Sequence, residues 1–430
     1  MKKFILFLVF FLPFQFALNP TPGIDLAIAR LLIVLAFFIW FILGLTRKKL
    51  TIPNNYITWG LLLFLLFSFL SVVKAEEISW AIRKLFVFLS IIPLYFVVST
   101  TLSNKDFLKI SKIFVYSSFG ISLLGIFQFI SQFIWDKNLI FDFWSKYLAS
   151  FFLGNAFSQS VISLPSWWVN IGGHTLLRAT SLFPDPHMLS FFLGMTLPFS
   201  VALLSIKKRS NKYYVIYGLV AIINLTCLIL TFSRGGYVGL LATGLLLLAI
   251  GIWKLNTKQW KKGKRKIIIL TSILIFLIVL IFSITPVRTR LFSSFDLSEG
   301  SVAGRIEIWQ QAFSVWRGNF FLGVGIGNYS YYLNPLFNYR LPVYAHNTYL
   351  DIAVEMGVFA LLAWLSIFAY TIYRLSRVQG PESRVPALVL SSSLIYFLAH
   401  SFFDTPIYSP RILPLLIIIL ALSSIIIKKD

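Results

Sequence analysis

The chain has 430 residues, of which 58% are hydrophobic and only 12% are charged, and its mean hydropathy is +0.83. This composition excludes an ordinary soluble domain, in which apolar residues make up roughly half of the chain. The formal net charge of +23 would suit a soluble nucleic-acid-binding protein, so its distribution along the chain has to be considered. Cys227 is the single cysteine, which excludes an internal disulfide and a cysteine-based metal site.

Apolar runs long enough to cross a bilayer recur along the whole sequence. Residues 1–17 resemble a cleavable signal peptide, but a second apolar run follows at once, which favours a retained first helix. We expect the other spans at about 25–45, 56–74, 81–101, 112–135, 184–205, 213–231, 237–253, 267–285, 347–373, 386–403 and 411–427. The sequence therefore predicts an all-α polytopic membrane protein, a single integral membrane domain over residues 1–430 with about twelve transmembrane helices.

The basic residues indicate how these helices are oriented. Of the 38 lysines and arginines, 24 fall on one side, at 2–3, 47–49, 105–112, 207–212, 254–266, 374–384 and 428–429. By the positive-inside rule that side is the cytoplasm, and both termini lie there. Most of the positive charge therefore reflects topology, and a nucleic-acid partner is not expected. Two long loops, 136–183 and 286–346, are predicted to lie on the periplasmic side.

The first long loop is rich in tryptophan, glycine and serine, as is typical of an interfacial segment. Its final stretch, which starts at Arg178, delivers polar groups to the top of the next span. Ser233-Arg234-Gly235-Gly236 is the whole connection between two later spans. A charge at membrane depth is costly and marks a functional candidate, and glycines that free the backbone at a helix N-terminus suit an anion. A snorkelling interfacial arginine is the alternative, but a location against the positive-inside trend favours an anion site.

The second long loop contains a predicted amphipathic helix at 301–317, followed by a stop at Gly318-Asn319. An apolar stripe is expected at Val302, Ile306, Trp309, Phe313 and Trp316. Such a helix can lie on the membrane surface and hold Arg305 over the spans, although the pattern alone is more typical of a scaffold. The run Gly323-x-Gly325-x-Gly327 follows no βαβ unit, so a turn is favoured over a nucleotide motif.

His346 and Asn347 open the next span, and Asn347, Asp351 and Glu355 form a polar stripe on one face of it. Carboxylates in a membrane helix normally find a partner inside the bundle, here Arg30 or Arg83. An imidazole titrates near neutral pH and can accept a proton from an attacking hydroxyl, which makes His346 the candidate base. His174 and His187 are further candidates, and His400 is expected to be a packing residue. No metal-binding motif is present, and no cofactor is expected.

These motifs together resemble the O-antigen ligase and O-antigen polymerase (Wzy-like) superfamily of bacterial membrane glycosyltransferases. His346-Asn347, nine residues and Gly357 are similar to the ligase pattern, although Ala360 stands where that pattern prefers Gly, Thr or Val. Ser233-Arg234-Gly235 resembles the family's arginine between adjacent spans. Gly304-Arg305 with Trp309 resembles its arginine on the helix of the large periplasmic loop. The resemblance covers about 178–375.

The resemblance implies a GT-C-like membrane fold with amphipathic helices in a large periplasmic loop, in the bacterial inner membrane. It implies metal-independent transfer of a glycan from an undecaprenyl diphosphate carrier at the periplasmic face. Arg234 and Arg305 would then bind the diphosphate, with Arg178 and Arg340 as additional ligands. His346 would act on the acceptor hydroxyl, either as the base or by orienting it. Ser233, Asn347, Asp351, Glu355 and Trp309 would support the site.

The acceptor distinguishes the enzyme classes within this resemblance. A ligase transfers the glycan to lipid A–core, whereas a polymerase transfers it to a second lipid-linked repeat unit. The His-Asn-x9-Gly pattern favours the ligase. A protein O-oligosaccharyltransferase would use the same donor. A transporter of lipid-linked sugars is the alternative from another class, although neither an internal repeat nor broken-helix pairs are recognisable in the sequence.

Overall fold

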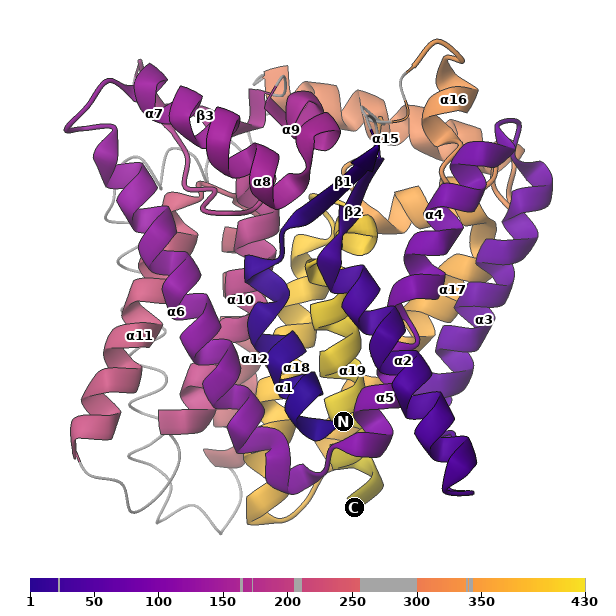
Figure 1. The fold of residues 1–430 in the computed structure, drawn as a ribbon, viewed down its shortest axis with the longest axis vertical. Helices are drawn as coiled ribbons and strands as arrows, with labels where there is room; N and C mark the ends of the chain where they lie inside the picture. Colours follow the sequence, from indigo (N-terminus) through magenta and orange to yellow (C-terminus); the bar gives the residue numbers. More distant parts are fainter. Residues whose placement is uncertain are drawn as a thin grey trace.

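The computed structural model consists mainly of long helices that run side by side (Figure 1). The structure describes residues 1–21, 24–162, 165–171, 173–204, 211–255, 300–337, 339 and 343–429. The long helices are α2 (Ile28–Thr46), α3 (Tyr56–Ser71), α4 (Ile78–Ile91), α5 (Leu94–Thr101), α6 (Phe107–Ser131), α10 (Pro186–Leu204), α11 (Asn211–Leu230), α12 (Arg234–Leu255), α17 (Thr348–Arg377), α18 (Pro381–His400) and α19 (Ile412–Lys429). The chain is therefore an all-α polytopic membrane protein.

Within the described residues, 7 helical segments are long and apolar enough to cross a membrane. They comprise α2, α3, α4 with α5, α6, α10, α11 and α17, and shorter apolar stretches lie in α12 and α19. The span predicted at 267–285 lies outside the described residues. The helix predicted at 1–17 is too long, because α1 (Lys2–Phe11) has 10 residues and the chain then forms an antiparallel hairpin of β1 (Ala17–Thr21) and β2 (Ile24–Ala27). The number of about twelve spans stays a prediction.

Helix α17 is interrupted at Gly357, whose φ of 80° and ψ of −179° are not helical. In a continuous helix, the amide of Val358 would donate to the carbonyl of Val354. Instead, Val358 donates to the carbonyl of Phe320 (3.0 Å), and Val354 accepts from the amide of Val324 (2.8 Å). The segment that contains Phe320 and Val324 therefore docks against the break in α17. A Cβ at position 357 would lie 2.0 Å from the carbonyl oxygen of Phe321 in this docked segment, so the close approach requires glycine.

The docked segment contains the run Gly323, Gly325 and Gly327, which forms a turn as predicted. All three have positive φ, at 67°, 97° and 73°, a conformation that other residues adopt at a cost. A Cβ at Gly323 would also lie 2.3 Å from the carbonyl oxygen of Val354. The glycines therefore attach the segment after α15 (Gly300–Gly318) to the break in α17.

Both chain termini lie at the lower end of the molecule in Figure 1. The opposite end, named the loop end below, carries α15 and α16 (Tyr329–Leu333). It also carries α7 (Lys137–Phe143), η4 (Trp144–Ala149), α8 (Ser150–Leu153), α9 (Asn155–Ile162) and the hairpin of β3 (Trp168–Ile171) and β4 (His174–Leu177). The described parts of both long loops therefore lie at the same end of the helices.

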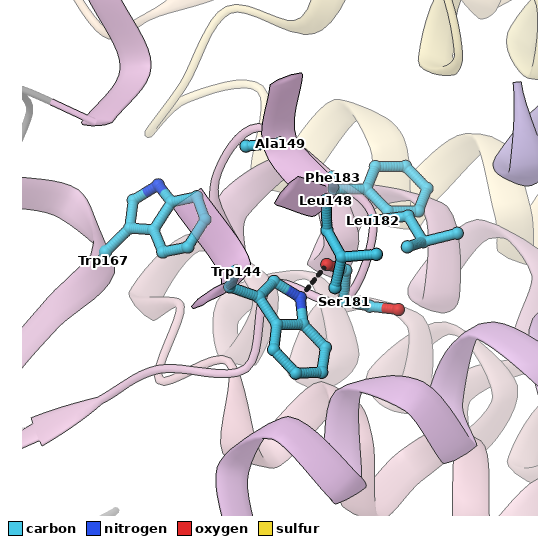
Figure 2. A pocket seen from close by; sticks show the side chains of 7 residues that line it. All are labelled: Trp144, Leu148, Ala149, Trp167, Ser181, Leu182 and Phe183. Carbon is cyan, nitrogen blue, oxygen red and sulfur yellow. Dashed lines mark hydrogen bonds between the residues drawn. The ribbon is translucent and has the colours of Figure 1, made fainter. Parts of the chain in front are cut away.

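Two indole rings attach the first of these segments to the connection that leads into α10. Trp144 Nε1 donates to the carbonyl of Ser181 (2.8 Å), as Figure 2 shows, and Trp167 Nε1 donates to the carbonyl of Pro184 (2.9 Å). Both rings line a small recess whose lining includes no ionisable side chain. The recess is therefore a packing contact, and the charged groups of the loop end gather elsewhere.

Candidate functional site

The N-terminus of α10 presents a carboxylate and an imidazole at the loop end. Asp185 Oδ1 accepts from the amides of His187 (2.8 Å) and Met188 (2.9 Å), and Pro186 occupies the first helical position. This is a helix N-cap, which explains why the helix begins here. His187 Nδ1 then lies 3.0 Å from Ser233 Oγ, so the start of α10 meets the connection that contains Arg234.

The entry to α12 is buried: Ser233 directly before the helix is 0% exposed, and Arg234, its first residue, is 3% exposed. Neither Gly235 nor Gly236 is among the residues with positive φ, so the backbone conformation does not require glycine at either position. They allow close packing instead. A Cβ at Gly235 would lie 2.3 Å from the ring of His400, and a Cβ at Gly236 would lie 2.1 Å from Oγ of a serine on α10. The small residues therefore bring Arg234 between α10 and α18.

Arg178 is buried (3% exposed) and holds two chain segments together. Its Nε donates to the carbonyl of Thr231 (2.7 Å), and its Nη1 donates to the carbonyl of Ser166 (2.8 Å). Thr231 is three residues before Arg234, so Arg178 fixes the start of that connection. The charge of Arg178 also acts on His187. Arg178 therefore belongs to the same site, where its Nε and Nη1 donate to backbone carbonyls.

His346 directly precedes Asn347, the N-cap of α17, and its backbone has a φ of 48°. A left-handed conformation at a residue other than glycine is uncommon and persists only where the surroundings impose it, often at functional sites. Asn347 is the N-cap of the helix, and its Oδ1 accepts from the amides of Tyr349 (3.0 Å) and Leu350 (3.3 Å). The side chain of His346 is 50% exposed, so a ligand can reach it.

Asp404, which the sequence analysis missed, lies between two histidines. Its Oδ1 is 3.6 Å from His346 Nδ1, and its Oδ2 is 3.8 Å from His187 Nδ1. Thr348 at the start of α17 fixes the turn that carries it, because its Oγ1 donates to the Asp404 carbonyl (2.8 Å) and its amide donates to the Ser401 carbonyl (2.9 Å). Asp404 therefore joins the start of α10 to the start of α17.

His400 is a buried packing residue, as predicted, but it also takes part in a polar contact. Its ring stacks on Phe191 with centroids 3.6 Å apart, and the residue is 0% exposed. Its Nε2 lies 3.2 Å from Ser233 Oγ, which also contacts His187. His187, Ser233, His346, His400 and Asp404 are referred to below as the histidine–aspartate cluster. Only His346 among its three imidazoles is highly exposed.

Arg305 lies on α15, which packs against α17. Trp309 Nε1 donates to the carbonyl of Ala345 (2.9 Å), the residue before His346. This hydrogen bond attaches α15 to the segment that carries His346. The helix bounds agree with the prediction, but the apolar stripe is partly wrong, because Phe313 is 52% exposed. The contact side is instead formed by Ile308, Trp309, Ala312, Val315 and Trp316.

Asp351 and Glu355 are buried on α17, as the polar stripe predicted, but neither pairs with Arg30 or Arg83. Asp351 accepts from the amide of Ala345 (2.8 Å) and from the hydroxyl of Thr405. Glu355 accepts from the hydroxyl of Tyr408, whose ring lies 3.8 Å from Lys84 Nζ. Asp351 therefore fixes Ala345, the residue before His346, and Thr405, the residue after Asp404. Glu355 fixes Tyr408, four residues after Asp404.

Two other residues that the sequence analysis singled out, His174 and Arg340, are not among the described residues of the histidine–aspartate cluster. His174 is exposed on β4. Arg340, predicted as a further diphosphate ligand, lies outside the described residues. Within those residues, no group of three or more His, Cys, Asp or Glu side chains could hold a metal ion.

The electrostatics of the site favour an ion pair between His346 and Asp404. The buried half of His346 opposes its protonation, but contact with Asp404 and the negative charge of Asp404 outweigh this effect and raise the pKa of His346. Arg305 is near enough for its charge to lower that pKa in part. Burial alone would raise the pKa of Asp404, but His346 and His187 hold it below its usual range. Burial and the charge of Asp404 raise the pKa of Asp185 to about 7.

These helices and contacts define a polytopic membrane protein with a site of arginines, histidines and a carboxylate at one end. Residues 219–365 match the model of a protein family described as O-Antigen ligase, a range that includes Arg234, Arg305 and His346. Residues 219–365 are therefore similar to that family, and the resemblance of the chain to the O-antigen ligase and polymerase superfamily is confirmed. Members of this family are glycosyltransferase-like enzymes of lipopolysaccharide synthesis. A search of curated proteins gave no match to the chain.

Proposed function

We propose that this protein transfers a glycan from undecaprenyl diphosphate to a hydroxyl of lipid A–core. The main support is that the half-exposed His346, paired with Asp404, lies within the electrostatic range of Arg305 and inside the family match. The family implies lipid-linked glycan substrates in general. A cationic site next to a reachable imidazole suits a diphosphate leaving group and an attacking hydroxyl.

In the proposed reaction, the acceptor oxygen attacks the anomeric carbon of the donor sugar. The new C–O bond forms as the bond from that carbon to the diphosphate oxygen breaks, and the electron pair leaves with undecaprenyl diphosphate. His346 takes the proton of the acceptor hydroxyl on its Nε2. Arg234 and Arg305 donate hydrogen bonds to the diphosphate and stabilise the charge that develops on it.

The proton arrangement follows from the contact between Asp404 and His346. A carboxylate beside Nδ1 favours the tautomer with hydrogen on Nδ1, which leaves the lone pair of Nε2 for the acceptor. Asp404 also stabilises the imidazolium that forms after proton transfer. Arg178 acts as a positioning residue, because its hydrogen bond to Thr231 fixes the connection that contains Arg234.

We assign the loop end to the periplasmic face of the inner membrane and both termini to the cytoplasm. This assignment rests on the positive-inside distribution of lysine and arginine. It agrees with the position of both termini at the end opposite the histidine–aspartate cluster (Figure 1). The carrier's polyprenyl chain would then lie against apolar helix surfaces, with its diphosphate at the loop end.

The experiment that tests this function offers two acceptors separately to purified protein in detergent. The donor is an undecaprenyl diphosphate-linked glycan, and the acceptors are lipid A–core and a second lipid-linked repeat unit. With EDTA present, we expect sugar on lipid A–core, read on a gel. A ladder of lipid-linked repeats would instead identify a polymerase, and transport of lipid-linked sugar without a new glycosidic bond would identify a transporter.

Replacing Asp404 with asparagine is expected to move the acidic limb of the pH profile of kcat/KM to lower pH by about one unit. His346 must be neutral to accept a proton, so activity is lost as pH falls through its pKa. Asp404 raises that pKa. Asparagine removes the negative charge beside His346, so the pKa of His346 falls. The acidic limb of the profile moves to lower pH with it. The measurement is kcat/KM over a pH series.

Asp142→Asn is the matched control, because Asp142 is an exposed acid of the loop end and stands outside the cluster. Its profile should coincide with that of the wild type. An unshifted acidic limb in Asp404→Asn would show that another group sets the pH dependence.

A further inference from the structure

A shallow recess lies between α2 and α4, which pack side by side (Figure 1). Its polar lining is Arg30 and Ser90, and the rest is apolar. Beside it, apolar side chains on both helices are turned outward, including Leu31 (42% exposed) and Phe86 (58% exposed). Apolar exposure on a membrane-spanning helix is suited to lipid chains, so the recess is accessible from the membrane.

Arg30 is held in this recess by neutral partners. Its Nε donates to Ser90 Oγ (2.9 Å), and its Nη2 donates to the carbonyl of Phe86 (3.1 Å). A guanidinium has five N–H groups, so these two bonds leave others for a ligand. Within the described residues, Arg30 forms no ion pair with a carboxylate. A charged residue at membrane level without a counter-ion indicates a binding site.

A second arginine lies close to the first. Arg83 on α4 is exposed, and its guanidinium carbon lies 5.2 Å from the ring centroid of Tyr339. Arg83 lies one helical turn before Phe86, whose carbonyl accepts from Arg30, so both arginines lie along the same stretch of α4. Arg83 also forms no ion pair with a carboxylate in the described part of the chain. Two arginines from two helices provide the forked donors that recognise phosphate.

The recess lies at the same end as the histidine–aspartate cluster. Arg30 is in the first turn of α2 and Arg83 in the second turn of α4, and both helices begin towards the loop end (Figure 1). Lys84, the neighbour of Arg83, donates to the hydroxyl of Tyr344, two residues before His346. Tyr339 is seven residues from His346, which limits their separation to about 25 Å. A glycan of a few sugars can span such a distance.

We propose that the recess between α2 and α4 binds the phosphate-bearing lipid anchor of the acceptor. This inference rests on the proposed function. It holds for both acceptor candidates, because lipid A–core and a lipid-linked repeat both carry phosphate on a lipid anchor. Arg30 and Arg83 bind the phosphate, the apolar surfaces of α2 and α4 contact the lipid chains, and the glycan extends to His346. Donor and acceptor phosphates are thus held by different arginines.

The test compares initial rates of the full-length protein and the double variant Arg30→Gln/Arg83→Gln. We expect the KM for the acceptor to rise about tenfold or more, with the KM for the donor and kcat unchanged. Arg377→Gln is the matched control, because Arg377 lies 5.3 Å from the ring of Tyr373 at the far end of α17. It loses one positive charge and a cation–ring contact similar to that of Arg83, and should keep the wild-type KM. An unchanged acceptor KM in the double variant would overturn the proposal.

Lipid binding gives a second measurement that does not require turnover. Wild type and double variant are placed in phosphatidylcholine nanodiscs and titrated with lipid A or its dephosphorylated form. We expect phosphate to improve binding by about tenfold in the wild type only. Equal competition by phosphatidylglycerol would identify a general anionic-lipid site and overturn the acceptor assignment. If the wild type transfers sugar to neither acceptor, the proposed function fails, whereas this comparison still decides whether the recess binds phosphate. The single variant Arg83→Gln, at an exposed position, repeats the test if the double variant does not fold.

Discussion

Replacement of His346 by alanine is expected to lower kcat for glycosyl transfer by about 10²- to 10⁴-fold, the contribution of a well-placed general base. The acceptor hydroxyl would then lose the group that takes its proton. Donor binding should persist, because Arg234 and Arg305 remain. The measurements are the initial rate with both substrates saturating and, separately, the binding of the undecaprenyl diphosphate-linked donor.

Two further histidine variants make this result specific. His174→Ala removes an exposed imidazole from β4 at the same end of the molecule, and should keep the wild-type rate. His346→Gln distinguishes a base from a residue that only orients the acceptor, because an amide can hydrogen-bond but does not accept a proton at neutral pH. We expect glutamine to be as inactive as alanine. A glutamine variant near the wild-type rate would assign an orienting role, and a fully active alanine variant would remove His346 from the reaction.

Features that depend on short-range signals could be predicted from the sequence. Asn347 has the side chain that caps a helix, and α17 begins one residue after it. Gly318 predicts the end of the amphipathic helix, and α15 ends there. The glycine run at 323–327 predicts a turn, and its three positive φ angles agree. Each of these features is determined within a few residues of the chain.

Asp404 was missed because its role depends on how separate helices pack. It lies in a short polar connection between the spans predicted at 386–403 and 411–427, and that position was the available signal. Periodicity shows which face of a helix is apolar, but not which helices are neighbours. The packing of α10, α17 and α18 brings Asp404 to His187 and His346.

The partners of the buried carboxylates were wrong for a related reason. Charge complementarity suggested Arg30 or Arg83 for Asp351 and Glu355, but a carboxylate is equally satisfied by neutral donors in the right place. Thr405 and Tyr408 are such donors, and both follow Asp404 on the same connection. The two arginines are consequently left for a ligand.

Replacement of Arg305 by alanine is expected to lower kcat/KM by about 10²- to 10³-fold, as for loss of one donor that stabilises a developing negative charge. Arg234→Ala should have an effect of similar size. Lysine at either position should restore only part of the activity, because an ammonium lacks the forked geometry that holds two phosphate oxygens. Rates are measured against donor concentration, and donor binding is measured without acceptor.

Arg317→Ala is the matched control for Arg305→Ala, since Arg317 is exposed in the last turn of α15 and its loss changes the net charge equally. It should leave kcat/KM within about twofold of the wild type, because a surface charge far from the reacting atoms contributes little. A similar loss in both variants would mean that the overall charge of α15, and not a contact of Arg305, attracts the donor. Because such long-range attraction is screened by salt, repeating the rates at high ionic strength separates the two. A diphosphate contact at Arg305 predicts that the difference between Arg305→Ala and Arg317→Ala survives in high salt.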